Sequence, residues 1–480
     1  MRIKLQSFAS FAATLLPHET AYLLRVQQFE DKTKLSVLEQ LHRNCLLAHP
    51  SPHFDESIDK RKYSSLKTWI SDRLHENDVD AQFEWMTDME RTIMTDAIHP
   101  EEERKLLKAI RQIGPTHFFF VKFYELVQTF RHFLLIRLRY DEHRLADEFL
   151  KNNRAAYEKS RETNEQLHSA TQDIVGQYST GAVESRQWQQ WLVSVFQDDQ
   201  LDGLNRYMAL IRLIFVHLNY GNLTLLLEQF EHLDRLFAHG TYYSRRLLLN
   251  YYSQRLLLYS KCKDYEKAAY YGYLSIRSKN SDYLHYVNNL AAVLMRAKKY
   301  QEALSVMKNA YPEAKITRNF HSKVGFVAFY IKCLNHNRQF KNAENYASTF
   351  LKAYKKEIFK YRWHLFFTAY FDALFRQGKF GKLLNEAQVY RILQKDKEYQ
   401  SKATYLPVIP WYCDVAKYCE SGWGLQQITG TICAYILSLP TDSEKLPLVR
   451  EFLDELKERA PEVNQLISNK LLERGRTVEF

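Results

Sequence analysis

The amino-acid sequence predicts an all-α protein: an α-solenoid of helical hairpins with an N-terminal helical domain and a C-terminal helical cap. Three observations support this prediction. Only Pro312 lies between Pro115 and Pro407, and helix interiors exclude proline because it removes a backbone donor and clashes with the preceding turn. Glycine is also rare, with 14 in 480 residues. A hydrophobic pattern that returns at intervals near 40 residues is typical of stacked helix pairs.

The chain divides into four predicted segments. Residues 1–140 form an N-terminal helical domain, interrupted by proline-containing loops. Residues 141–200 are polar; Asp141–Val175 is expected to be one long solvated helix, followed by a glycine-containing linker. Residues 201–400 contain the repeats, and residues 401–480 form the C-terminal helical cap.

Each repeat has an aromatic residue directly after a short polar turn. Spacings of 35, 40 and 40 residues separate Tyr265, Tyr300, Phe340 and Phe380. Three of the four are followed three positions later by a small residue, which lets the second helix of a pair lie close to the first. These small residues are Ala268, Ala303 and Ala343.

The segment Val287–Ala310 resembles a tetratricopeptide repeat. The matching positions are Leu290, Ala291 and Leu294 in the first helix and Tyr300, Ala303, Met307 and Ala310 in the second. Neighbouring units depart from the pattern: Leu383 replaces the small residue, and two periods exceed the usual length of about 34 residues. The resemblance covers about residues 205–400 and implies a right-handed array of helical hairpins that serves as a binding scaffold, without implying a particular ligand.

Positive charge is concentrated in the repeats. Residues 241–400 contain 29 Lys and Arg against 11 Asp and Glu, a net charge of +18, whereas the rest of the chain carries −7. A basic, aromatic-rich repeat array is typical of a surface that meets phosphates or acidic peptides.

Many of these cations fall near the ends of the predicted second helices, and we call this set the basic ridge. Stacked repeats would align such ends along one edge of the array. Capping is the competing interpretation, because a cation near a helix C-terminus contributes about 0.3–1 kcal/mol. The basic ridge comprises Arg277, Lys279, Lys315, Arg318, Lys352, Lys355, Lys356, Lys360, Arg391, Lys395 and Lys397.

A second candidate surface is a concave groove lined by first-helix side chains. If the family geometry holds, these side chains project toward the concave side, where asparagine amides could hold a peptide backbone; surface residues without a role are the alternative. The predicted groove residues are Asn288, Asn289, Lys332, Asn335 and Arg362. Some tyrosines near residues 242–252 and 270–273 are also expected to face a groove, since each buried hydroxyl needs a partner. They are Tyr242, Tyr243, Tyr251, Tyr252, Tyr270, Tyr271 and Tyr273.

No catalytic residue, metal site or cofactor is predicted. The sequence contains no zinc-binding cysteine pairs and no His-Glu-x-x-His motif. His42, Cys45 and His49 could share a helix face, but a fourth ligand is not evident, and Cys413 lacks a local histidine base. Six cysteines without a disulfide pattern and the lack of an uncharged apolar span predict a soluble, cytoplasmic protein.

These features together predict a non-enzymatic protein–protein interaction scaffold or adaptor whose basic, aromatic-rich helical repeat array binds a partner protein or an acidic peptide. The alternative is a nucleic-acid-binding helical repeat protein in a regulatory or ribonucleoprotein complex. An enzyme with its active site in residues 1–140 and self-association into a homo-oligomer also stay open, and no membrane partner is expected.

Overall fold

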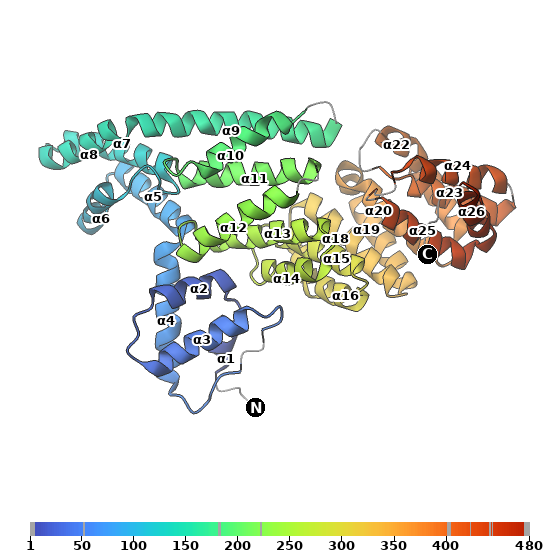
Figure 1. The fold of residues 1–480 in the computed structure, drawn as a ribbon, viewed down its shortest axis with the longest axis horizontal. Coiled ribbons are helices and arrows are strands. Elements are labelled where there is room, and N and C mark those ends of the chain that lie inside the picture. Colours follow the sequence, from blue (N-terminus) through green and yellow to red (C-terminus); the bar gives the residue numbers. More distant parts are fainter. Residues whose placement is uncertain are drawn as a thin grey trace. The chain divides into compact units, whose positions relative to one another are not determined.

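The computed structural model describes residues 5–50, 53–180, 184–220, 223–400, 405–422, 424–440, 443 and 445–474. These residues form α-helices and one short 3-10 helix and contain no strand, which confirms the all-α class (Figure 1). The chain divides into two compact units, unit 1 with residues 1–280 and unit 2 with residues 281–480. This division differs from the four predicted segments, because it falls inside the predicted repeats.

Unit 1 is built from helices that pack mainly against neighbours in sequence. The order is α1 (Gln6–Ala12), α2 (Pro17–Val26), α3 (Lys32–Cys45), α4 (Lys60–Asn77), α5 (Val79–Met94), α6 (Pro100–Gln112), α7 (Phe120–Ile136), α8 (Tyr140–Asn152), α9 (Arg154–Thr180), η1 (Arg186–Trp188), α10 (Gln189–Gln197), α11 (Gly203–Tyr220), α12 (Leu223–His239), α13 (Arg245–Lys261) and α14 (Tyr265–Ser275). The long helix α9 lies along α11, which also contacts α10 (Figure 1).

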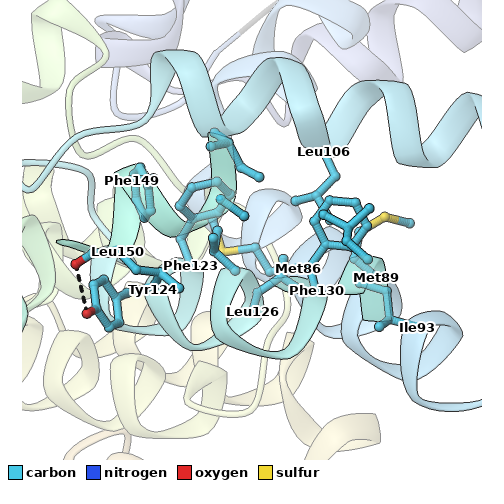
Figure 2. Close-up of a cluster of buried hydrophobic side chains, with 14 of the residues drawn as sticks. Met86, Met89, Ile93, Leu106, Phe123, Tyr124, Leu126, Phe130, Phe149 and Leu150 are labelled. Carbon is cyan, nitrogen blue, oxygen red and sulfur yellow. Dashed lines mark hydrogen bonds between the residues drawn. The ribbon is translucent and has the colours of Figure 1, made fainter. Parts of the chain in front are cut away.

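The predicted long helix from Asp141 to Val175 is wrong, because the chain breaks at Asn153 between α8 and α9. The Asn153 side chain donates to the carbonyl of Phe149 at 2.8 Å and so satisfies an acceptor in the last turn of α8. Figure 2 shows why α8 belongs with α7: Phe149 and Leu150 lie in one apolar cluster with Phe123, and the hydroxyl of Tyr124 donates to the carbonyl of Leu150. Helix α9 continues past the expected break at Gly176 to Thr180; Gly181 lies outside the described residues.

The N-terminal helices contact the last helices of unit 1, because α2 packs on α12 and bonds to α13. Glu19 in α2 is fully buried and accepts two hydrogen bonds from Arg245, at 2.9 and 3.0 Å, and one from the hydroxyl of Tyr243. His18 lies 2.7 Å from the hydroxyl of Tyr252 and 2.9 Å from Asp234. The expectation that tyrosines near residues 242–252 face a groove is therefore wrong for these two, since the N-terminal helices supply their partners.

Unit 2 continues as helical hairpins in which each first helix packs on the next. Helix α15 contacts α18, α18 contacts α20, and α20 contacts α23. The elements are α15 (Tyr283–Arg296), α16 (Tyr300–Asn309), α17 (Tyr311–Ile316), α18 (Phe320–His336), α19 (Phe340–Tyr361), α20 (Trp363–Phe375), α21 (Phe380–Val389), α22 (Ile392–Tyr399), α23 (Val408–Ser421), α24 (Leu425–Ser438), α25 (Leu446–Arg459) and α26 (Pro461–Glu473). The aromatic residues of α20, such as Phe366, Phe371 and Phe375, are buried as core.

The turn before each repeat aromatic has one backbone geometry. Lys263, Lys298, Arg338 and Gly378 all have left-handed φ angles, of 61°, 59°, 57° and 69°. The next residue donates its amide hydrogen to a carbonyl five positions earlier, as in Lys299 to Leu294 at 2.8 Å. This is the Schellman end of a helix, which satisfies an otherwise unpaired carbonyl.

The two 40-residue periods contain a short third helix that the 35-residue period lacks. After α16 comes α17, which has Pro312 in its first turn, where a backbone donor is not needed. Helix α19 is interrupted at Tyr354, where φ is −131° and ψ is 35°, and residues 355–361 form its short second part. The unit that begins at Phe380 has a third helix as well, which is α22. The chain turns into it at Arg391, with φ 51°. The third helices account for the excess over the usual repeat length.

Candidate functional site

Nine residues of the basic ridge lie in unit 2; eight of them lie in the third helices or next to them, and Lys352 lies at the end of a second helix, as predicted for all nine. Lys315 and Arg318 lie in and just after α17. Lys352 lies before the break in α19, and Lys355, Lys356 and Lys360 lie after it. The remaining three are Arg391, which precedes α22, and Lys395 and Lys397 within it.

These nine side chains have no acidic partner among the residues that the structure describes. Eight are exposed and Lys395 is half-buried, and none forms an ion pair with a described carboxylate. By contrast, Lys382 in α21 lies 2.8 Å from Glu344. The charge of the ridge is therefore not neutralised within this part of the chain.

Lys355, Lys356 and Arg391 each lie between the end of one helix segment and the start of the next. The two lysines begin the second part of α19, and Arg391 immediately precedes α22. Cations near the first turn of a helix are unfavourable with respect to its dipole. The same side chains also follow the C-terminus of the first part of α19 or of α21, where the helix dipole favours cations, so capping of the preceding helix stays open as an interpretation of their position.

Cation–aromatic contacts join the ridge lysines of α19 to those of α22. The ammonium nitrogen of Lys355 lies 5.0 Å from the ring centroid of Tyr390, and that of Lys395 lies 5.2 Å from the ring of Phe359. The rings of Phe359 and Tyr390 are 6.1 Å apart. These contacts place the two ammonium groups near aromatic rings and connect the second part of α19 with α22 and the residue pair before it.

The remaining two ridge residues lie in unit 1. The prediction that Arg277 is part of a binding surface is wrong. Its guanidinium donates to the carbonyls of Leu15 and Cys45, both at 3.0 Å, and to that of Leu47. Burial lowers the pKa of this arginine from its usual value. Arg277 holds the N-terminal helices to α14, so it is not available to a partner; Lys279 is exposed.

Two of the predicted groove residues, Asn289 and Arg362, contact histidine side chains. Arg362, just before α20, donates through Nε to Nε2 of His321 in α18 at 3.0 Å. Gly325, one turn after His321, leaves room for this approach, because a Cβ there would lie 3.2 Å from the Arg362 guanidinium and 3.4 Å from the amide of Asn288. Asn289 lies on α15 with its amide 3.3 Å from His285. Side chains from three successive first-helix positions therefore converge.

The two histidines of this cluster favour the neutral form. Burial, followed by the positive charge of Arg362, lowers the pKa of His285 and of His321. Sequence analysis missed both residues and Gly325. The sequence contained one signal for His285: it lies four residues, or one helical turn, before Asn289, so the two side chains share a helix face.

Two predicted groove residues are buried instead of accessible. Asn335 is 1% exposed and donates to the carbonyl of Ala369 at 3.0 Å and to Asp372 at 2.8 Å, so it joins α18 to α20. Asn288 is 4% exposed, and its Oδ1 has no hydrogen-bond partner among the described residues. Lys332 is half-buried. Burial raises the pKa of Glu451, but the hydrogen bond from His336 and the charge of Lys332 outweigh it and lower this pKa to about 2.

The other chemistry-bearing candidates are structural in the described part of the chain. His42 lies 2.9 Å from the Thr20 hydroxyl, and burial raises the pKa of the Cys45 thiol to about 12. No group of three or more His, Cys, Asp or Glu side chains among the described residues is placed to hold a metal ion. No described helix has both the length and the apolar composition needed to cross a membrane.

Comparison with known proteins gives no match to a family model, to a curated protein or to a solved structure.

Proposed function

We propose that this protein is a non-enzymatic scaffold that binds an acidic segment of a partner protein through unit 2. The observation that carries the proposal is the set of nine ridge cations in unit 2, which have no carboxylate partner among the described residues. An acidic segment laid across α17, α19 and α22 would meet charge that the chain itself does not neutralise.

We propose further that the hairpins of unit 2 form an α-solenoid of the tetratricopeptide type. The packing of each first helix on the next supports this arrangement. The cluster of Asn289, His321 and Arg362 would then contact the same partner from the concave side. All six cysteines are free thiols, which supports a location in a reducing compartment, the cytoplasm.

The charged surface is expected to act mainly on the rate of association. Exposed charge pairs contribute only about 0.2–1 kcal/mol each, and salt screens them. They steer the encounter and exclude partners of the wrong charge. Affinity should therefore fall steeply as salt is raised.

Charge reversal tests the proposal. The variant Lys352→Glu/Lys355→Glu/Lys356→Glu should lose about ten- to hundredfold in affinity for the captured partner at low salt, because three attractive charges become repulsive. The matched control is Arg104→Glu/Lys105→Glu/Lys108→Glu, which makes the same charge change on exposed positions of α6. Partners are captured from the native host with and without nuclease treatment and quantified by mass spectrometry.

A partner that both triple variants capture equally would contradict the proposal, since the ridge would then be a solvated face. Loss of the partner in both variants would assign the effect to net charge instead of the ridge.

The second candidate function is nucleic-acid binding, which the cation–aromatic contacts favour. Lys360 lies 5.2 Å from the ring of the exposed Tyr361, and an aromatic face beside a cation can stack a base. Under this alternative, nuclease treatment removes the captured material, and the logarithm of the affinity for single-stranded oligonucleotides falls linearly with the logarithm of salt concentration.

A further inference from the structure

A surface pocket of about 580 Å³ opens beside the basic ridge, between α21, α22 and α23. Leu384 and Leu393 are half-buried side chains in its lining, and Cys413 is a buried one. Burial raises the pKa of the Cys413 thiol to about 12, so it is a neutral thiol that behaves as a small apolar group. The interior of the pocket is therefore suited to an apolar side chain.

The rim of the pocket carries positive charge. Arg391 and Lys417 line it and are exposed. Lys417 is paired with Asp414 at 3.2 Å, whereas the guanidinium of Arg391 has no bonded partner among the described residues. Arg391 directly follows Tyr390, whose ring lies under the ammonium of Lys355. The rim is thus continuous with the basic ridge along α19 and α22.

We propose that this pocket receives one aliphatic or aromatic side chain of the acidic segment, while carboxylates next to that side chain in the segment meet Arg391 and the ridge lysines. The inference rests on the proposed function and adds a sequence requirement to the partner. A charged ridge alone selects any acidic segment, whereas a ridge with an apolar pocket selects an acidic segment with an apolar residue inside it.

Two fluorescein-labelled peptides test this requirement on the full chain. Both are nine residues of Glu and Asp, with either Leu or Ser at the centre, and their affinities are measured by fluorescence anisotropy at low salt. The leucine peptide should bind about tenfold or more tightly than the serine peptide, because burial of a leucine side chain is worth about 1.5–3 kcal/mol.

Filling the pocket should abolish that preference. Gln388 is exposed and lines the pocket, so Gln388→Trp should make the two peptides bind equally without disturbing the core. The control is Asn385→Trp, an exposed position on the same helix outside the pocket lining, which should keep the preference.

Arg391→Gly removes the rim charge without a folding penalty. Glycine adopts the left-handed φ of 51° at this position more readily than arginine does, so the melting temperature should hold or rise. Affinity for both peptides should fall about two- to fivefold, as expected for one exposed charge.

The outcomes separate the inference from the proposed function. If both peptides bind equally and charge reversal at Lys352, Lys355 and Lys356 abolishes this binding, the inference about the pocket is wrong. The proposed binding of an acidic segment then stands. No binding of either peptide overturns both, as does binding of a single-stranded oligonucleotide in their place.

Discussion

Arginine side chains have two different roles in this chain. Arg245 and Arg277 hold helices of unit 1 together through Glu19 and through backbone carbonyls. Arg318 and Arg391 are exposed, and neither forms an ion pair among the described residues. Residue type alone cannot separate these roles, because the difference depends on which acceptors the fold brings near each guanidinium.

The contact of Arg362 with His321 makes a prediction at this scale. Arg362→Gln should raise the pKa of His285 and of His321, because it removes a nearby positive charge, although burial keeps both below 6.5. NMR titration of the imidazole carbons in the folded protein measures both values. Arg318→Gln, an exposed arginine absent from the electrostatic surroundings of either histidine, is the control; unchanged histidine pKa values in Arg362→Gln would show that burial alone lowers them.

The same two histidines set the sign of a pH effect. The folded state keeps both imidazoles neutral, so the unfolded state takes up protons first as the pH falls. The free energy of unfolding of unit 2 should therefore decrease below about pH 6.5.

At the scale of elements, the Schellman turn recurs outside the predicted repeats. Leu138 has a φ of 58°, and the next amide, that of Arg139, donates to the carbonyl of Leu134 at 3.0 Å. Tyr140 then begins α8, as an aromatic residue begins each repeat helix. The sequence Leu138-Arg139-Tyr140 also has a turn followed by an aromatic residue. The short polar turns of the predicted repeats do not include it, because Leu138 is apolar.

This turn gives a stability prediction. Leu138→Gly should raise the free energy of unfolding by about 0.5–1 kcal/mol, since relief of left-handed strain exceeds the added entropy of the unfolded chain. Leu138 is 68% exposed, so little packing is lost. Leu135→Gly, three residues earlier in the right-handed part of α7, should lower it by about 1 kcal/mol. Urea unfolding measures both, and destabilisation by Leu138→Gly would show that the leucine packs on the turn.

At the scale of the whole molecule, positive charge belongs to one unit. Residues 281–480 contain 30 Lys and Arg against 20 Asp and Glu, a net charge of +10, whereas residues 1–280 contain 37 against 36. The compact units thus separate a nearly neutral part of the chain from a basic one.

This separation predicts where binding lies. Residues 281–480, produced alone, should bind the acidic leucine peptide within about threefold of the full chain, because the pocket and nine ridge residues lie there. Residues 1–280 should not bind it. Circular dichroism establishes that each fragment is helical before anisotropy is measured, and binding by folded residues 1–280 would contradict the assignment.

The helical class, the hairpin turns and the concentration of charge can be predicted from local features, because proline content, periodicity and composition act along short stretches of the chain. The sequence also indicated the excess length of two repeats, although not the third helices that account for it. Helix packing decides that Asn335 is buried, that Arg277 bonds to backbone carbonyls of the N-terminal segment, that Tyr243 and Tyr252 bond to the N-terminal helices, and that Arg362 meets His321. These contacts join residues from about 30 to more than 260 positions apart, and no local pattern records which side chains the packing of helices brings together.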